Sequence, residues 1–491
     1  MATAGDRQSP TENMSRERPR MNPADSALTL GLLAGATAVL AGIVLAFGGP
    51  IAGAAVILGG LSTLLVLRNS ELGFFAVIAV VALLPFATLP VDIGLTPTFL
   101  DFALGAAIVV WLLGIVTGKQ RRIITAPVAL PLILFIIAAV FAFIFGLANG
   151  PLTPTLLRKF AELLLSLGFV LIVIDYCRTW ARLERLVQLL LLMGAAAAII
   201  AIGLWLLPDD TANSALNALS RVGYPGGWVI RYIEENPELS ERAIGTSVDP
   251  NSLGGLLLMI GALVGPQIAT RKPLFRRWVI WGIAGLVLLA LVLTFSRGAM
   301  LGLAAGLGFV AMARYRRLIP YMLVAALLLL LLPFTQAYIA RFLEGFQGSD
   351  LATQMRFGEY KDALRLIARY PVFGVGFAGS PDIDLYTAVA SVYFTIAGRM
   401  GLFGLSAFFG VIGTVFVYAF RNRKAARTDE RRDAVWLGLH AALVGALVAG
   451  VFDHYLFNMD FHHAVTIFWM VLGMAVASTR LVREAAAPES H

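Results

Sequence analysis

The chain has 491 residues, of which 59% are hydrophobic and 14% charged, and its formal net charge is +8. An ordinary soluble domain carries about 25% charged residues, so this composition excludes a soluble enzyme and predicts a polytopic membrane protein. The single cysteine, Cys177, excludes an internal disulfide and argues against redox chemistry. The basic residues lie in short loops between apolar blocks, where they orient a membrane protein rather than bind nucleic acid.

The predicted fold is all-α, a bundle of about fourteen transmembrane helices. A helix needs about 20 apolar residues to cross a bilayer. Residues 1–26 are polar, and we expect them to form a disordered cytoplasmic tail. The apolar blocks begin after this segment. We expect a transmembrane domain over 27–480 and a second cytoplasmic tail over 481–491. The expected spans are 27–48, 51–67, 72–90, 98–117, 127–148, 155–176, 184–207, 249–268, 277–295, 299–315, 318–334, 386–419, 433–453 and 459–478.

The positions of the basic residues predict the orientation of the chain. With the N-terminus inside, every inner loop is basic, as the positive-inside rule requires, and both termini are cytoplasmic. Twelve of the 38 lysines and arginines fall on the opposite face, where topology does not require them, so they are candidates for function. They are Arg158, Lys159, Arg221, Arg231, Arg242, Arg297, Arg341, Arg356, Lys361, Arg365, Arg369 and Arg399.

Two of the predicted periplasmic loops are long, 208–248 and 335–385. Structureless loops of this length are uncommon in compact proteins unless they have a function. Within the second loop, the apolar residues between Leu351 and Tyr370 follow approximately helical spacing, and Pro371 should end that helix. We therefore expect a helical periplasmic loop that carries part of a functional site.

The first candidate anion ligand is Arg297, which lies with Ser296 and Gly298 in a short hinge between two apolar blocks. An arginine at this depth is unfavourable unless it is paired or functional, and a snorkelling arginine at a helix end is the plain alternative. Gly298 would let the backbone approach a phosphate, and the next helix would offer its positive N-terminus.

Arg242 and Arg356 are further candidates. Arg242 precedes Asp249-Pro250-Asn251, which is typical of a capped helix start, but the cap does not explain the arginine. Arg356 lies on the predicted loop helix with Glu359 and Tyr360. The plain interpretation is that oppositely charged side chains three residues apart form ordinary ion pairs on a solvent-exposed face of the helix. The functional interpretation is that Arg356 points into a cavity under the helix and that the ring of Tyr360 forms a surface on which a sugar stacks.

Other polar residues have simpler interpretations. Arg158 lies four residues before Glu162, so a mutual ion pair competes with a substrate-binding role. His454 lies beside Asp453 in a short outer loop. We expect it to be a histidine at the membrane interface whose ring is hydrogen-bonded, and not a catalytic base. The sequence shows no metal-ligand spacing and no nucleotide-binding glycine or lysine motif. We therefore expect no metal and no cofactor.

Four segments in this chain order resemble the bacterial superfamily of O-antigen ligases and O-antigen or exopolysaccharide polymerases. The resemblance covers about residues 240–415, and the rest of the chain agrees in hydropathy alone. The segments are Arg242…Gly245…Asp249-Pro250-Asn251, Ser296-Arg297-Gly298, Arg356…Tyr360…Pro371…Gly374…Gly376 and Tyr393…Gly398…Gly401…Gly404.

The resemblance implies a helical membrane glycosyltransferase of the GT-C type. Known members transfer glycans from undecaprenyl pyrophosphate on the periplasmic face, without a metal and with inversion at the sugar carbon. Their arginines bind the pyrophosphate, and by motif these roles fall on Arg242, Arg297 and Arg356. Arginine suits the role because it makes permanently charged, bidentate contacts to phosphate.

The residue that accepts the proton of the acceptor hydroxyl is left open. Ligases of the superfamily often have a histidine and a neighbouring asparagine just before the position of Tyr393, where this chain has Val389-Ala390-Ser391-Val392. The missing histidine tilts the interpretation slightly towards a polymerase. The available carboxylates are Asp382, Asp384, Glu359 and Asp249.

We expect an inner-membrane enzyme that polymerises undecaprenyl-pyrophosphate-linked repeat units on the periplasmic face, in contact with membrane lipid and with a chain-length regulator as a candidate partner. The alternatives are a ligase that transfers the chain to a lipid core or a protein, a lipid-linked glycan flippase or exporter, and a non-catalytic scaffold. A transporter should carry ionisable residues in mid-helix. Here the arginines collect at one face, which favours the enzyme.

The orientation can be tested by labelling single cysteines with a membrane-impermeant reagent. A Ser349→Cys variant should react from the periplasm, and an Ala425→Cys variant only from the cytoplasm, because the basic inner loops fix the direction of every span. Labelling of position 349 from the cytoplasm would overturn the assignment of the site to the periplasmic face.

Overall fold

The computed structural model of the protein describes residues 71–88, 96–117, 123–320, 323–324, 327, 351–380 and 389–486. All of them belong to the larger of two compact units, Thr63–His491. The predicted tail 1–26, the spans 27–48 and 51–67, and most of the span 318–334 lie outside the described residues. The total number of spans therefore stays a prediction.

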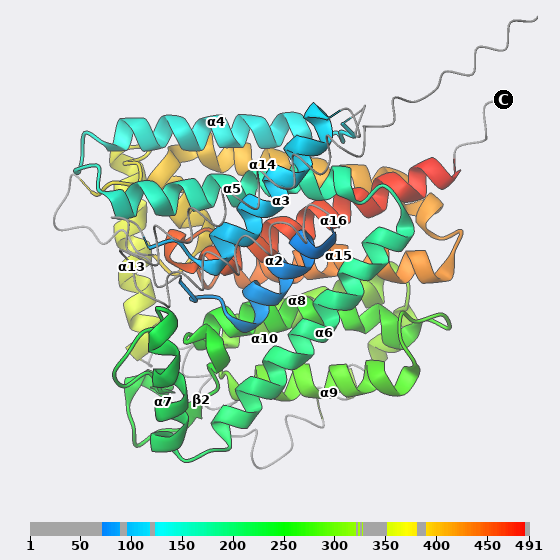
Figure 1. Ribbon diagram of the computed structural model, residues 1–491, viewed down its shortest axis with the longest axis horizontal. Coiled ribbons are helices and arrows are strands. Elements are labelled where there is room, and N and C mark those ends of the chain that lie inside the picture. Colours follow the sequence, from blue (N-terminus) through cyan, green and yellow to red (C-terminus); the bar gives the residue numbers. More distant parts are fainter. Residues whose placement is uncertain are drawn as a thin grey trace, which may run out of the picture. The chain divides into compact units, whose positions relative to one another are not determined.

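The described part is all-α apart from one two-stranded sheet, which confirms the predicted fold class (Figure 1). Seven of its helices are long and apolar enough to cross a membrane, judged by length and composition. The predicted spans within the described residues each overlap a helix. The longer helices are α2 (Glu71–Leu83), α3 (Phe99–Val116), α4 (Ala129–Gly146), α5 (Pro154–Tyr176), α6 (Trp180–Trp205), α8 (Pro250–Ala269), α9 (Arg277–Leu293), α10 (Arg297–Ala313), α13 (Leu351–Arg369), α14 (Val392–Ala426), α15 (Glu430–Ala449) and α16 (His462–Ala486).

Helix α16 is enclosed by the other helices. Its most apolar stretch is fully buried, and it packs against α5, α14 and α15. Beside it, α10 and α15 approach backbone to backbone. A Cβ atom on Gly302 would lie 2.6 Å from the carbonyl oxygen of Gly445, and one on Gly306 would lie 2.8 Å from that of Ala441. Small residues allow this close packing in membrane bundles, where burial from water does not drive helices together.

A kink in α14 holds the end of α13. Gly401 has φ 67° and ψ −173°, which interrupts the helix. The kink frees two N–H groups of α14, which bond to the turn that follows α13. The amide of Leu402 donates to the carbonyl of Pro371 at 2.7 Å, and that of Phe403 donates to the carbonyl of Val372 at 3.2 Å. Helix α13 is thereby fixed to the bundle through backbone groups.

The glycines after α13 complete this junction. The amides of Val375 and Gly376 donate to carbonyls of α14, at 2.9 Å to Gly398 and 2.8 Å to Arg399. Gly374 has φ 68°, and a Cβ atom there would lie 2.5 Å from the carbonyl oxygen of Gly398. The predicted loop helix is confirmed, and it runs crosswise to α4, α5 and α14 (Figure 1).

The long loop 208–248 contains a short helix, α7 (Asp209–Asn217), three 3-10 turns and the sheet. Its two strands pair antiparallel, with Arg231 opposite Arg242. The sequence did not predict these strands, because two residues are too few to show alternation. The remaining elements are the strands β1 (Arg231–Tyr232) and β2 (Glu241–Arg242) and the turns η1 (Ala218–Val222), η2 (Ile233–Glu235), η3 (Gly245–Ser247), η4 (Arg316–Leu318) and η5 (Met459–Phe461).

Replacing the kink glycine tests how α13 is held. A Cβ atom on Gly401 would lie 2.1 Å from the carbonyl oxygen of Val372, and the backbone conformation itself is unfavourable for other residues by about 1–3 kcal/mol. Gly401→Ala should lower the melting temperature of the purified protein and increase proteolysis near α13. Gly410→Ala is the matched control on the same helix, since nothing lies within 4 Å of its added Cβ. Equal melting temperatures for the two variants would contradict this account.

Candidate active site

The segment before α8 is fixed to the turn between α9 and α10. The Nε of Arg242 donates to the carbonyl of Thr294 at 2.9 Å, and one terminal nitrogen donates to Oδ1 of Asn251 at 2.9 Å. The amide of Ala243 donates to the carbonyl of Leu293 at 2.8 Å. The guanidinium of Arg242 therefore lies between the start of α8 and the α9–α10 turn.

Asp249 caps α8 as predicted. Its side chain accepts a hydrogen bond from the amide of Ser252 at 2.7 Å, and Pro250 occupies the first helical position. An N-cap oxygen satisfies one of the unpaired amides at a helix start. Because Asp249 is also near Arg242, the cap places a carboxylate beside the guanidinium.

The hinge with Ser296 and Arg297 lies against the loop between α15 and α16. The preceding residue, Phe295, has a left-handed φ of 53°, and α10 begins at Arg297. Ser296 is buried, and its hydroxyl makes no capping bond. A Cβ atom on Gly298 would lie 3.2 Å from Cβ of Phe452. Arg297 is thus half-buried next to the segment that contains Asp453.

Polar contacts of α13 hold its inner face on two other segments. A carboxylate oxygen of Glu359 accepts a hydrogen bond from the amide of Ala390 at 2.9 Å. The hydroxyl of Tyr360 lies 3.1 Å from the carbonyl oxygens of both Ala390 and Val451. Its ring packs against Phe394, with the centroids 5.2 Å apart. Glu359 and Tyr360 therefore join α13 to the start of α14 and to the end of α15.

Arg356, one turn earlier on α13, lies within electrostatic range of Asp453. The two charges attract one another, and Asp453 also interacts with Arg242. Burial raises the pKa of the Asp453 carboxyl, and Arg356 is the first group that opposes this shift. Burial likewise raises the pKa of Asp249, and the nearby Asp453 adds to the increase.

These contacts define an arginine–aspartate cluster made of Arg242, Asp249, Arg356 and Asp453. Two guanidinium groups that keep their charge lie within electrostatic range of two carboxyl groups that hold their protons more tightly than usual. When either carboxyl is protonated, the cluster carries excess positive charge. Such a site attracts a polyanion, and arginine pairs match the geometry of phosphate oxygens.

His454 lies beside this cluster. Its Nδ1 is 3.2 Å from the side-chain nitrogen of Asn458 and 3.8 Å from Oδ1 of Asp453. Burial lowers the pKa of His454, although nearby carboxylates including Asp249 oppose the shift. The ring is therefore neutral at pH 7. The contact with Asn458 agrees with the predicted interfacial histidine.

The remaining predicted residues lie elsewhere. Arg158 forms the expected pair with Glu162, 3.0 Å apart, and donates to the carbonyl of Thr96 at 3.0 Å. A cavity of about 40 Å³ does lie under α13, but among its lining residues the arginine is Arg399 and not Arg356. Arg356 does not line this cavity, and the expectation that it points into a cavity under the helix stays a prediction. Asp382 and Asp384 lie outside the described residues.

Asp453 is the cluster member that sequence reasoning undervalued. It was noted only as a neighbour of His454 in a short loop. Its partners are more than 90 residues away in the sequence, so no spacing rule could connect them. One signal for Asp453 was available in the sequence. It is an acidic residue in a predicted outer loop, on the same face as several arginines that the membrane orientation does not require.

Residues 282–409 match the family described as O-antigen ligase. The match includes the hinge with Arg297, Arg356 on α13 and the kinked first part of α14, and it confirms the resemblance seen in the sequence. It supports a glycan-transferring membrane protein of the O-antigen ligase or polymerase type. Arg242 and Asp453 fall outside the matched range. No curated protein matches the chain.

Proposed function

We propose that this O-antigen-ligase-like protein polymerises oligosaccharide repeat units carried on undecaprenyl pyrophosphate, and that the reaction takes place at the arginine–aspartate cluster. The observation that carries the proposal is the mutual electrostatic interaction of Arg242, Arg356 and Asp453, which come from three separate segments. The proposed location is the periplasmic face of the inner membrane, with both termini in the cytoplasm and a chain-length regulator as a candidate partner.

Arg242, Arg297 and Arg356 would hold the pyrophosphate of the donor. Arg242 is fixed by two hydrogen bonds to protein groups, so its remaining N–H groups are preoriented. Arg356 comes from a helix that docks through Glu359 and Tyr360. Arginines aimed at a leaving pyrophosphate stabilise the charge that develops there. Their charge would perform the task that a bound metal performs in other phosphate sites, so we propose a metal-independent reaction.

Asp453 would accept the proton of the acceptor hydroxyl. The acceptor oxygen attacks the anomeric carbon from the side opposite the pyrophosphate, and the bond from that carbon to the phosphate oxygen breaks with inversion. The bonding electrons leave with undecaprenyl pyrophosphate, and the hydroxyl proton passes to Asp453. A carboxylate with a raised pKa is a better base than an ordinary one. Glu359, engaged by the amide of Ala390, would position this segment instead.

Two other functions compete with this proposal. A ligase would use the same donor site but transfer the finished chain to a lipid core or a protein. Nothing in the cluster discriminates between the two acceptors, and a reconstituted assay that offers each acceptor separately would do so. A flippase or exporter would move the lipid-linked glycan without breaking its phosphate bond, and release of undecaprenyl pyrophosphate would exclude it.

Replacing the arginines tests donor binding. Arg297→Ala and Arg356→Ala should each reduce glycan chain formation about 100- to 1000-fold, in cells that lack the native protein, with membrane levels checked by blot. Lysine at either position should rescue in part, because it keeps the charge but loses the planar fork. Arg365→Ala is the control on α13, since its side chain is 64% exposed and pairs with Asp362. Normal chains from both alanine variants would refute the pyrophosphate site.

Replacing the proposed base tests the chemistry. Asp453→Asn keeps the shape of the side chain but cannot take up a proton, so the turnover rate should fall about 100- to 10,000-fold. Burial raises the pKa of Asp453, so the wild-type rate should fall with decreasing pH at values above about 4, the usual range of an aspartate. Glu238→Gln, which changes an exposed carboxylate in the loop 208–248, should retain activity. A normal rate for Asp453→Asn would remove Asp453 from the mechanism.

A further inference from the structure

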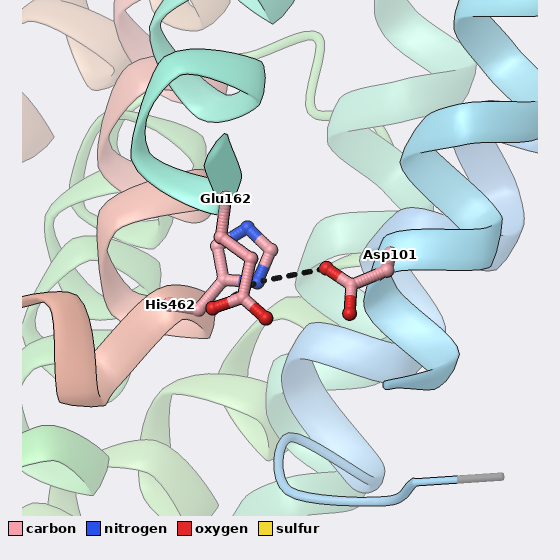
Figure 2. A group of neighbouring side chains, drawn as sticks. All are labelled: Asp101, Glu162 and His462. Carbon is pink, nitrogen blue, oxygen red and sulfur yellow. Dashed lines mark ion pairs between the residues drawn. The ribbon is translucent and has the colours of Figure 1, made fainter. Parts of the chain in front are cut away.

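A second polar cluster lies between the first turns of α3 and α16 and the third turn of α5. It consists of Asp101, Glu162 and His462, whose side chains point towards one another from three separate helices (Figure 2). Nδ1 of His462 lies 3.7 Å from Oδ1 of Asp101 and 3.8 Å from Oε2 of Glu162. One ligand atom from each residue lies within 4.8 Å of the others.

The donor atoms of this cluster are poorly satisfied. His462 is 8% exposed and Glu162 is 4% exposed. Neither ring nitrogen of His462 makes a hydrogen bond of good geometry, and neither does Oδ1 of Asp101; the backbone of Glu162 is the group nearest to a partner for the ring. Buried polar groups normally form hydrogen bonds, and each exception needs an explanation. An imidazole enclosed with two carboxyl groups, without a hydrogen bond of good geometry to orient it, is an arrangement that a bound cation would satisfy.

The outer contacts of the cluster resemble those of a metal site. The second carboxylate oxygen of Asp101 accepts the amide of Thr98 at 2.7 Å. Oε1 of Glu162 pairs with Arg158 at 3.0 Å. Such partners hold ligating carboxylates in a fixed direction. Arg158 balances the charge of one carboxylate, that of Glu162. The charge of the other carboxylate, Asp101, remains unbalanced and favours a bound cation.

The spacing fits a small divalent ion. In a tetrahedral site with bonds of about 2.1 Å, ligand atoms lie about 3.4 Å apart. The observed 3.7 and 3.8 Å would close to this value with shifts of a few tenths of an ångström. An imidazole with two carboxylates suits Zn²⁺, Mn²⁺ or Fe²⁺, whereas Mg²⁺ and Ca²⁺ prefer oxygen ligands alone. The side chain of Asp101 is 17% exposed, so the cluster lies close to the surface on that side.

We propose that Oδ1 of Asp101, Oε2 of Glu162 and Nδ1 of His462 bind one divalent transition-metal ion that ties α3, α5 and α16 together. The nearby ion pair of Lys159 with Asp460 joins α5 to the loop before α16. The ion would therefore fix the loop that also carries Asp453. It is structural and belongs to a different cluster from the one proposed for glycan transfer, so neither proposal depends on the other.

Metal binding can be measured on the full-length protein in lipid nanodiscs, with affinity tags removed. After dialysis against a chelator, the protein is loaded with Zn²⁺ or Mn²⁺, desalted and analysed for metal by mass spectrometry. The wild type should retain about one equivalent of one of these ions and melt at a higher temperature with it, and excess Mg²⁺ should not displace it. Retention of neither ion would overturn the proposal.

Matched variants identify the ligands. His462→Gln and Asp101→Asn should each weaken metal binding at least tenfold, and Asp101→Asn keeps an oxygen for the amide of Thr98, so it should fold. His440→Gln is the control for a buried histidine, because the ring of His440 already bonds to Trp436 and Thr479. Full metal retention in both ligand variants, or loss in the control alone, would contradict the assignment.

Discussion

The attraction between Arg356 and Asp453 connects the parts of the protein that matter for its proposed function. A guanidinium keeps its charge at any physiological pH, so a half-buried arginine needs an anion nearby. Asp453 supplies it from the loop between α15 and α16, and Arg242 and Asp249 extend the pairing to the start of α8. Without these opposite charges, α13 would bring an unpaired cation against the ends of the bundle.

The same pairing would prepare the site for an anionic substrate. Hydrogen bonds from Glu359 and Tyr360 and the glycine junction with α14 hold α13 independently of the charges. A pyrophosphate could therefore replace the aspartates as the partner of the arginines while the scaffold stays in place. Because burial raises the pKa of Asp249, a proton can neutralise that carboxyl when the substrate displaces it, which leaves Asp453 ionised as the proposed base. Such preorganised charge is a large term in many enzymes.

Local features of this chain could be predicted from its sequence, and contacts between distant segments could not. Helix α13 was found from its periodicity and its end at Pro371, and the cap formed by Asp249 was found from the Asp-Pro pair. Both depend on neighbours in the sequence. Asp453 and the group around His462 depend on helices that meet only in three dimensions. The surroundings of Arg356 could not be predicted either, because periodicity does not define which neighbour a helix face meets.

The pairing of Arg356 with Asp453 can be measured most directly by a double-mutant cycle. Arg356→Gln, Asp453→Asn and the double variant would be compared with the wild type by thermal unfolding in nanodiscs without substrate. Paired charges predict that the two substitutions are not additive, with a coupling of about 0.5–3 kcal/mol, and that the double variant is more stable than the sum of the single losses implies. Strictly additive losses would show that the two side chains do not interact and would contradict the account.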